Sequence, residues 1–478
     1  MIRIMIASPS SGSGKTSITI ALLNVLKKRG LNIVSFKTGP DYIDPLFHKN
    51  VLGVKSHNLD TFFTSKGKTL ELFNEASDGA DIAVMEGVMG LYDGVGGVLM
   101  EGSTYDLAAV TETPVILVVN AKGMGKSVIA LIKGFLSMDD KKLIKGVILN
   151  RTSKSFYSII KEEIEKELGI RVLGFMPDKK EVSLSNRHLG LVTPGEIEDI
   201  NEIIDILSKD LEENVDVDAV LKVAGEAPDE TLGGASGLMA VEAPGEALGV
   251  ATGVASVETF GENVVSTTKP VIAISKDEAF CFLYEENVNE LKKAGAEIKY
   301  FSPLHDKSLP NDADAVILVG GYPEEYLKIL SDNESMMMSV KEAADKGMPV
   351  VAECGGFMYL HKIIKDKDGI EYKGVGIIDG ECYYTGHLVR FGYVDIKEKK
   401  FNFLESNGMI KGHEFHYFDS TYNGDDCIIT KVYSKKSYDA VIDKDNMWAG
   451  FPHLYYPSGG DWTMGLVKKA VKYHEEKN

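Results

Sequence analysis

Hydrophobic residues up to about residue 210 gather in short runs separated by longer amphipathic stretches. The runs are rich in Val, Ile and Leu without polar alternation, which is typical of strands buried on both faces of a parallel sheet. These runs are Ile2–Ala7, Asn32–Phe36, Asp81–Glu86, Val115–Asn120 and Gly146–Asn150. The stretches between them, such as Thr16–Arg29 and Phe156–Leu168, favour helices. We therefore predict a doubly wound α/β domain over residues 1–213.

The pattern ends after this domain. Between Val223 and Thr268 there is no Lys or Arg, and small residues dominate. Such a segment buries too little apolar surface to offset the entropy that it loses on ordering. Residues 214–268 are therefore predicted to form a flexible Gly/Ala/acidic linker. The alternative is that its Gly-Val-Ala repeats form one or two weak strands.

A second α/β pattern covers residues 269–478. Compact apolar runs predict another sheet, and Glu286–Ala294 predicts a helix. These runs are Val271–Ser275, Ala315–Val319 and Pro349–Ala352. Beyond about Glu371, aromatic residues and alternating positions favour an antiparallel extension. The alternating segments are Glu381–Leu388, Phe391–Ile396 and Ile428–Tyr433.

Composition narrows the class of protein. A chain of 478 residues that is 44% hydrophobic and 26% charged is typical of a globular protein with two or three domains. Its net charge of −19 repels polyanions, so we expect neither nucleic acid nor a membrane surface as a partner. No secretion signal, membrane-span-length apolar run or C-x-x-C pair is found, and a cytoplasmic location is expected. The oligomeric state stays open between a monomer and a homodimer.

A phosphate-binding motif follows the first predicted strand and opens the first predicted helix. Glycines in such a loop let backbone N–H groups surround phosphate oxygens at the positive end of the helix. The predicted ATP-binding residues are Ser11, Gly12, Ser13, Gly14, Lys15 and Thr16. Pro9 replaces the first glycine of the usual pattern. A coincidental turn is the alternative, but the flanking strand and helix argue against it.

Carboxylates follow two other predicted strands of the same sheet. Glu86 ends one strand, and Asp41 and Asp44 follow another, at the edge where ligands bind in open α/β sheets. Because Mg²⁺ prefers oxygen ligands, Thr16, Asp41 and Glu86 are candidate metal ligands. For each acid alone, a solvated loop carboxylate is the alternative. Asn150, at the end of its strand, either reads the adenine edge of ATP or is a simple turn residue.

The second domain contains Glu-Cys-Gly-Gly, with Cys354 on a turn between a predicted strand and helix. A nucleophile on such a turn is presented beside backbone N–H groups that can stabilise an oxyanion. Gly355 and the pair Gly320 and Gly321, which follows another strand, are candidates for that pocket. A buried structural cysteine is the alternative. The candidate histidine partners are His387, His413, His416 and His453, of which we favour His453.

Together these motifs resemble the cobyrinate a,c-diamide synthase family of glutamine-dependent amidotransferases, over nearly the whole chain except the linker. The strings that carry the resemblance are Ser-Gly-Ser-Gly-Lys-Thr, Lys-Thr-Gly-Pro-Asp-Tyr-Ile-Asp-Pro, Met-Glu-Gly-Val-Met-Gly-Leu-Tyr-Asp-Gly, Arg187-His-Leu-Gly-Leu, Glu-Cys-Gly-Gly-Phe-Met-Tyr-Leu and Gly-His-Glu-Phe-His-Tyr. The resemblance implies a dethiobiotin-synthetase-like ATP domain followed by a class I, cobalamin-type glutaminase domain. It also implies a nucleophilic role for Cys354 and an activating role for His453. Ordinary class I glutaminases have His-x-Glu where this chain has His453-Leu-Tyr455, so a dyad is expected rather than a triad.

The implied reaction is amidation of the a- and c-carboxylates of cobyrinate in cobalamin biosynthesis, with ATP, Mg²⁺ and L-glutamine. Each carboxylate would be activated as an acyl phosphate, and Asp41, Tyr42 and Asp44 would position it. Ni-sirohydrochlorin, on the way to the nickel cofactor of methanogenesis, and hydrogenobyrinate are alternative substrates. A non-catalytic P-loop ATPase switch is an alternative of another class. A dethiobiotin-synthase-like ligase would leave Cys354 and the second domain unexplained.

Overall fold

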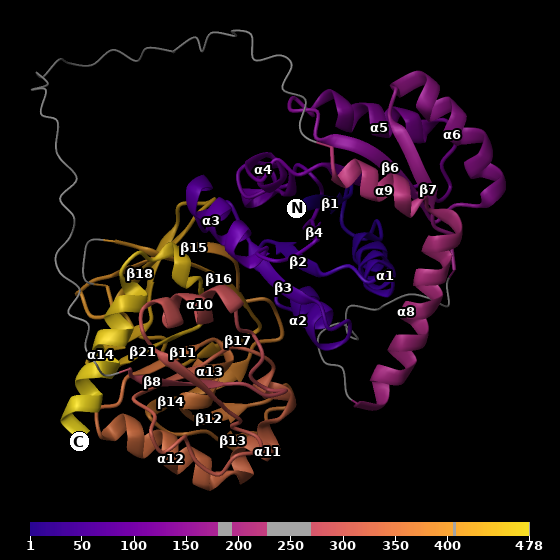
Figure 1. Cartoon of the computed structure of the whole chain (residues 1–478). Coiled ribbons are helices and arrows are strands. Elements are labelled where there is room, and N and C mark those ends of the chain that lie inside the picture. Colours follow the sequence, from indigo (N-terminus) through magenta and orange to yellow (C-terminus); the bar gives the residue numbers. More distant parts are fainter. Residues whose placement is uncertain (180–193, 227–268, 405–407, 478) are drawn as a thin grey trace, which may run out of the picture.

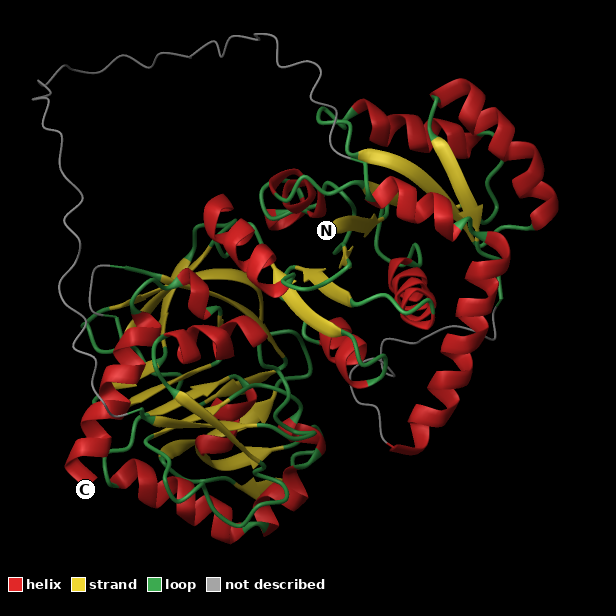
Figure 2. Ribbon diagram, in the orientation of Figure 1, coloured by secondary structure: helices red, strands yellow, loops and turns green. Residues whose placement is uncertain are grey.

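The chain folds into two α/β domains, one coloured indigo to magenta and one orange to yellow in Figure 1. This computed structural model describes residues 1–179, 194–226, 269–404 and 408–477. The Arg187 string and residues 227–268 of the predicted linker lie outside this range. Figure 2 shows helices packed against the sheets in both domains.

A seven-stranded parallel sheet forms the centre of the N-terminal domain, in the order β3-β2-β4-β1-β5-β6-β7. Its strands are β1 (Ile2–Ala7), β2 (Ile33–Thr38), β3 (Lys55–Leu59), β4 (Ile82–Glu86), β5 (Val115–Asn120), β6 (Ile144–Asn150) and β7 (Arg171–Phe175). Helices α1 to α6 are Lys15–Lys28, Ile43–Asn50, Lys66–Ala76, Thr104–Val110, Ser127–Ser137 and Lys154–Leu168, and a 3₁₀ turn, η1, covers Val95–Gly97. The predicted doubly wound parallel sheet is confirmed. Strands β3 and β7 were not predicted, because they lie at the two edges and begin with polar or charged residues.

The predicted start of the linker at residue 214 lies too early in the sequence. Helix α8 (Pro194–Asn214) is followed at once by α9 (Val217–Ala224). The Asp216 side chain caps α9 by accepting a hydrogen bond from the Ala219 backbone N–H, and Val217, Val220 and Val223 are buried in the N-terminal core. Three valines at helical spacing, together with the buried Ala224, dock this short helix, so residues 217–224 belong to the N-terminal domain.

The C-terminal domain contains a six-stranded sheet in the order β20-β21-β11-β10-β8-β9, which is parallel except for its β20–β21 pair. Its strands are β8 (Val271–Ser275), β9 (Glu297–Phe301), β10 (Ala315–Leu318), β11 (Val350–Glu353), β20 (Ile442–Lys444) and β21 (Met447–Gly450). The helical elements are α10 (Glu285–Lys293), η2 (Pro323–Glu325), α11 (Leu327–Asp332), α12 (Glu334–Asp345), α13 (Gly355–Leu360), η3 (Tyr456–Ser458) and α14 (Trp462–Lys477). Strands β8, β10 and β11 correspond to the three apolar runs of the sequence.

Two smaller sheets form the predicted antiparallel extension. The order β13-β12-β14-β17 is mixed, and the order β19-β18-β15-β16-β22 is antiparallel throughout. The strands are β12 (His361–Lys365), β13 (Glu371–Lys373), β14 (Ile378–Tyr384), β15 (Arg390–Glu398), β16 (Ile410–His416), β17 (Phe418–Ser420), β18 (Cys427–Lys431), β19 (Ser437–Ala440) and β22 (His453–Leu454). One face of the second sheet points toward the N-terminal domain.

The two domains share a buried contact. Tyr284 and Tyr455 of the C-terminal domain belong to the hydrophobic core of the N-terminal domain. Tyr393 donates a hydrogen bond of 2.6 Å to Asp60, and the Lys411 ammonium donates one of 2.6 Å to the Phe62 carbonyl. Such a combination of apolar burial and satisfied polar groups holds two domains in a defined orientation.

Among the helices in the described ranges, none has the length and apolar character needed to cross a membrane.

Candidate active site

The phosphate-binding loop leads from β1 into α1, and a hydrogen bond between Lys15 and Ser8 joins its two ends. Gly14 caps α1 with φ of 97°, and a Cβ there would lie 2.0 Å from the Asn150 side-chain nitrogen, so only glycine fits. The Lys15 ammonium donates to Ser8 Oγ at 2.9 Å and to the Met89 carbonyl at 2.7 Å. Lys15 therefore stands between the loop and the segment after β4, where it can move onto a phosphate oxygen.

Asn150 braces the loop. Its side-chain amide donates to the Ser13 carbonyl at 2.8 Å, and its oxygen accepts from the Arg151 backbone N–H at 2.9 Å. These contacts give Asn150 a structural role in shaping the phosphate-binding loop. A contact between Asn150 and the adenine edge of ATP stays a prediction.

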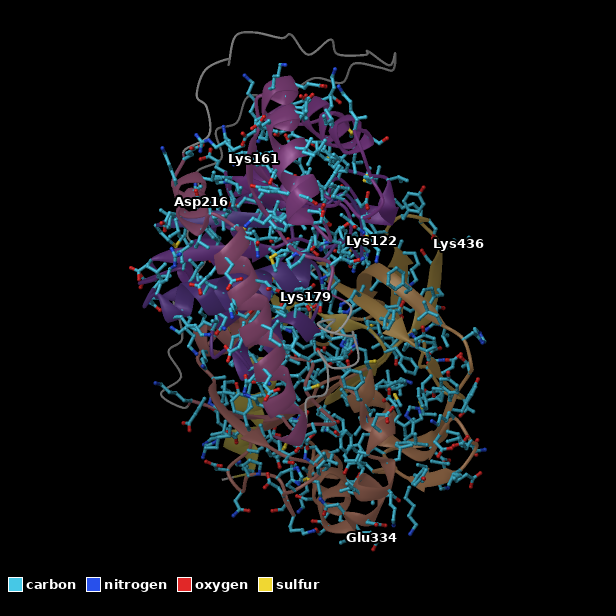
Figure 3. The ribbon with its side chains drawn as sticks, turned by 90° about the vertical axis from the view of Figure 1, so that its right-hand side faces the viewer. Lys122, Lys161, Lys179, Asp216, Glu334 and Lys436 are labelled. Carbon is cyan, nitrogen blue, oxygen red and sulfur yellow. The ribbon has the colours of Figure 1, made fainter. Side chains whose placement is uncertain are left out.

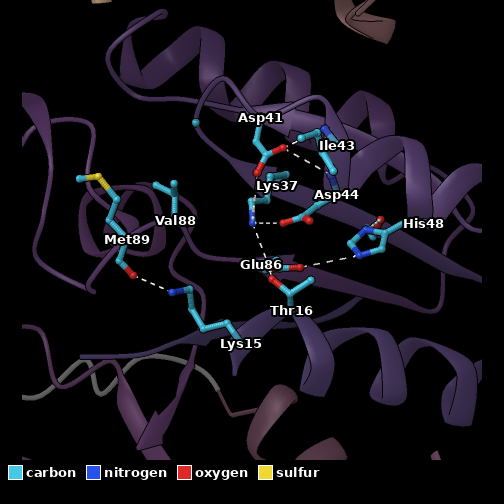
Figure 4. A network of polar contacts seen from close by, with 12 residues as sticks. Lys15, Thr16, Lys37, Asp41, Ile43, Asp44, His48, Glu86, Val88 and Met89 are labelled. Carbon is cyan, nitrogen blue, oxygen red and sulfur yellow. Dashed lines mark hydrogen bonds and ion pairs between the residues drawn. The ribbon is translucent and has the colours of Figure 1, made fainter. Parts of the chain in front are cut away.

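A buried lysine joins the carboxylates at the ends of β2 and β4 (Figure 4). The Lys37 ammonium contacts a carboxylate oxygen of Asp44 directly, Glu86 Oε1 at 2.9 Å and Asp41 Oδ2 at 3.7 Å. Thr16 Oγ1 donates to the same Glu86 oxygen at 2.6 Å. The structure thus brings together Thr16, Asp41, Asp44 and Glu86 as the sequence predicts, and adds a cation that was not singled out.

Burial dominates the electrostatics of this cluster. Burial, together with the charge of Asp44, raises the pKa of Glu86 to about 7, and burial together with the charge of Lys37 lowers the pKa of Lys15 to about 8. Burial also lowers the pKa of His48, whose Nε2 lies 3.7 Å from Glu86 Oε2, to about 4. Burial would lower the pKa of Lys37 as well, but the three carboxylates outweigh it and hold its pKa well above the ordinary value.

The residues of the cluster fit a bound Mg²⁺ ion that nucleotide phosphates complete. No group of three or more His, Cys, Asp or Glu side chains in the described part of the chain is arranged to hold a metal by itself. Glu86 Oε2, however, is buried and has no hydrogen-bond partner among the described residues, and Thr16 Oγ1 donates to the other oxygen of the same carboxylate. Hard oxygen donors of this kind suit Mg²⁺, which keeps phosphate and water in its remaining positions.

Tyr42 points away from the carboxylates between which it lies in the sequence. Its ring is only 6% exposed and packs between rings of the C-terminal domain. It stacks on Phe282 at 4.8 Å between centroids and lies 5.5 Å from the ring of His453. The Tyr42 ring therefore lies between the two domains, and its role in positioning a substrate carboxylate stays a prediction.

Cys354 occupies the turn between β11 and α13. Its φ of 46° and ψ of −104° are unusual for a residue with a side chain, and such strain is typical of a nucleophile held at the start of a helix. The side chain is buried, and burial raises the pKa of the thiol, so the resting group is a neutral thiol. Burial likewise lowers the pKa of His453 well below its ordinary value. A neutral imidazole can accept the thiol proton.

The three predicted glycines surround this turn. A Cβ on Gly355 would lie 3.2 Å from the Gly321 backbone nitrogen, so the two backbones meet beside Cys354. A Cβ on Gly320 would lie 2.3 Å from Cε1 of His453. The segment 320–321 therefore lies against both the Cys354 turn and the His453 imidazole, and its backbone is close enough to contribute to an oxyanion pocket.

His453 has an aromatic neighbour in the place of a carboxylate. Within the described residues, its Nδ1 has no hydrogen-bond partner. Its ring stacks on His413 at 4.9 Å with 15° between the planes, because the two are register partners of β22 and β16. The pairing of Cys354 with His453 as a dyad stays a prediction. The remaining candidates are engaged elsewhere: His416 is bonded to the Phe418 carbonyl and His387 to the Thr385 carbonyl.

Two residues of the cluster, Lys37 and His48, escaped the sequence analysis. The signal for Lys37 was a lysine at the end of an apolar run, in a strand that proves buried at every position. A charged residue there requires a partner, and the nearby acids supply it. His48 carried no such signal, because a histidine within an amphipathic helix is common.

Comparisons with known proteins match both domains of the chain. Residues 4–192 match the model of the CobQ/CobB/MinD/ParA nucleotide binding domain, and residues 271–460 match that of the CobB/CobQ-like glutamine amidotransferase domain. Relatives named cobyrinate a,c-diamide synthase include one from Caldanaerobacter subterraneus, 37% identical over 94% of this chain and 94% of its own. One from Thermoplasma volcanium is 36% identical over 99% of this chain and 98% of its own. One from Picrophilus torridus is 38% identical over 95% of this chain and 96% of its own. The chain therefore belongs to the cobyrinate a,c-diamide synthase family of glutamine-dependent amidotransferases.

Proposed function

We propose that this protein amidates the a- and c-side-chain carboxylates of cobyrinate, using ATP and glutamine. The relatives that share nearly its full length carry this activity in their names. The single observation that supports it most is the loop between β2 and α2. This loop holds Asp41, and the first turn of α2 holds Asp44, in the N-terminal cluster, while Tyr42 lies 5.5 Å from the ring of His453. The two half-reactions are therefore adjacent.

In the N-terminal half-reaction, a peripheral carboxylate of the substrate takes the γ-phosphoryl group of ATP and becomes an acyl phosphate. A carboxylate needs this activation because it is a poor electrophile toward ammonia. Lys15 leaves the Met89 carbonyl and neutralises charge on the transferred group. Thr16 and Glu86 would hold Mg²⁺, which would supply further charge neutralisation at the phosphates. The Lys37 ammonium favours the ionised form of Asp44 and opposes the burial that raises the pKa of Glu86 to about 7.

In the C-terminal half-reaction, Cys354 releases ammonia from glutamine. His453 accepts the thiol proton as sulfur attacks the amide carbon, and backbone N–H groups of Gly321 and Gly355 stabilise the oxyanion. His453 then donates the proton to the leaving ammonia, and water hydrolyses the thioester to glutamate. Ammonia attacks the acyl phosphate, phosphate leaves, and the cycle repeats on the second carboxylate.

Other substrates share this chemistry. Ni-sirohydrochlorin and hydrogenobyrinate have equivalent acetate side chains, so incubation with each acid is part of the test. A non-catalytic P-loop ATPase switch predicts nucleotide binding without glutaminase activity. The strained Cys354 turn and the buried imidazole beside Gly320 favour catalysis over that alternative.

The test combines product analysis with one variant. Mass spectrometry of wild-type reactions with ATP, glutamine and each tetrapyrrole acid should show two successive replacements of carboxylate by amide. Cys354→Ser should abolish synthesis with glutamine and retain synthesis with free ammonium, because only nitrogen release requires the thiol. Failure of ammonium to rescue this variant would contradict the division of labour between the domains.

A further inference from the structure

Three exposed aromatic side chains stand together on the antiparallel sheet of the C-terminal domain. Phe391, Phe415 and Tyr417 are 64%, 51% and 41% exposed. The rings of Phe391 and Phe415 lie 5.8 Å apart edge to face, and those of Phe415 and Tyr417 lie 5.9 Å apart. Large aromatic rings exposed side by side mark a binding surface rather than a random feature. We name these three residues the aromatic ledge.

The ledge continues the interdomain contact. Phe391 pairs with Phe415 across β15 and β16, two positions from the pair of Tyr393 and His413. Because side chains alternate along a strand, both pairs lie on the same face, separated by about 7 Å. The His413 ring is 5.7 Å from Tyr42, in the loop of the N-terminal cluster. The aromatic ledge therefore lies two positions along β15 and β16 from the residues that contact the N-terminal domain.

A basic hairpin borders the ledge. The turn between β18 and β19 follows β15 closely, since the Val432 backbone N–H donates to the Tyr393 carbonyl at 3.3 Å. Tyr433 of this turn is 59% exposed, and its ring lies over Gly96 of the N-terminal domain, where a Cβ would come within 2.3 Å of it. Lys435 and Lys436 are exposed and form no ion pair within the described residues. Figure 3 shows Lys436 at the outer edge of the sheet.

We infer that the aromatic ledge and the basic hairpin bind the macrocycle of the tetrapyrrole substrate, so that the C-terminal domain holds the acid whose side chains the N-terminal domain activates. This inference rests on the proposed function. The substrate class has a broad apolar ring with carboxylates around its rim. The surface has a matching form, with aromatic rings at its centre and unpaired lysines at its edge.

Charge supports this occupant over another. The chain carries a net charge of −19, so a polyanion is repelled by most of the surface. Lys435 and Lys436, which have no acidic partner among the residues that the structure describes, give local attraction beside the ledge, where a polycarboxylate must dock. The apolar rings then gain contact with the macrocycle face, which water solvates poorly. A second copy of this acidic chain would meet like charge instead.

The experiment compares binding of cobyrinate and of sirohydrochlorin, followed by the absorbance of the macrocycle, without ATP or glutamine. The double variant Phe391→Ser/Phe415→Ser should bind about tenfold more weakly or worse, because truncation of exposed anchor rings typically costs at least that factor. Phe401→Ser, which removes a ring that is 56% exposed elsewhere in the same domain, is the matched control and should bind normally.

The lysines are tested by charge and by salt. Lys435→Ala/Lys436→Ala should weaken binding about three- to tenfold at low ionic strength and flatten its salt dependence. Lys367→Ala/Lys400→Ala removes the same charge from exposed positions outside the hairpin. It should leave the affinity for the tetrapyrrole and its salt dependence unchanged. In steady state, both test variants should raise KM for the tetrapyrrole and leave KM for ATP and for glutamine within about twofold, as expected when only one ligand is lost.

Two outcomes separate this inference from the proposed function. If the wild-type protein forms the diamide and the ledge variant keeps wild-type KM for the tetrapyrrole, the ledge assignment is wrong while the function stands. If the wild-type protein amidates none of the acids, the proposed function fails and the ledge assignment fails with it. Sedimentation showing a wild-type dimer that the ledge variant dissociates would assign the surface to a second copy and overturn the inference.

Discussion

Replacement of Lys37 by methionine should expose the electrostatic design of the N-terminal site. The Lys37 side chain is 4% exposed, and its ammonium neutralises Asp44, Glu86 and, more distantly, Asp41. Methionine keeps the length of the side chain and removes the charge. Removing one partner of a buried ion pair costs about 3–5 kcal/mol, because the other partner stays buried and uncompensated. For a domain of this size, that loss lowers Tm by roughly 6–20 °C.

The loss should depend on pH in a defined direction. Burial and Asp44 already raise the pKa of Glu86 to about 7, from 4.5. Between these values the folded state binds more protons than the unfolded state, so stability falls as pH rises. Without Lys37 the pKa of Glu86 moves higher still, and the decline extends above pH 7. The Tm deficit of the variant should therefore be larger at pH 8 than at pH 6.

Differential scanning calorimetry from pH 5.5 to 8.5 measures this effect. The control is Lys55→Met, which makes the same chemical change at an exposed position on the neighbouring strand β3 and should change stability by less than about 0.5 kcal/mol. A Lys37→Met variant with wild-type Tm at pH 8, or with a deficit that does not change with pH, would refute the reasoning.

Three further predictions concern other parts of the site. Lys15→Ala should lose synthesis with glutamine and with free ammonium alike, measured as amide product, because it acts on the phosphoryl group; unimpaired turnover would remove Lys15 from the mechanism. Gly320→Ala should lower glutaminase activity about 100-fold or more while synthesis from ammonium continues, because the added Cβ displaces His453, and a 1 Å misplacement of a catalytic group costs that much; normal glutaminase kinetics would contradict the assigned contact. Tyr393→Phe removes the hydroxyl that donates to Asp60 and should destabilise the protein by about 1–3 kcal/mol above pH 6. Burial raises the pKa of Asp60 to about 6, so below that pH the carboxyl group is protonated and loses less when the donor is removed. A Tm difference that does not change with pH would argue against that hydrogen bond.

The sequence was sufficient for the parts of the molecule that local rules govern. Strands buried on both faces, such as β1 and β5, were predicted from their apolar runs. The phosphate-binding loop and the Cys354 turn were identified by their glycine-rich motifs. The edge strand β3 was not predictable, because a polar edge strand resembles a loop.

What remained unpredicted depends on contacts between distant segments. The position of Tyr42 against His453 arises from docking of two domains, and no pattern within either segment encodes it. The pairing of Lys37 with three acids likewise requires the strand order, since β2 and β4 are neighbours in space but separated by β3 in the sequence. Asn150 could be assigned to the loop only once Ser13 was known to lie opposite it.

The loop between β2 and α2 has a consequence for engineered chimaeras. Asp41 of this loop belongs to the N-terminal cluster. The Tyr42 ring packs against the rings of Phe282, Tyr284 and His413 in the other domain, which together form its binding pocket. Fusing this N-terminal domain to the nitrogen-donating half of an unrelated enzyme would leave that ring without its binding pocket. The two domains therefore cannot be exchanged independently. A chimaera that contains this loop must also contain the aromatic residues that pack against Tyr42.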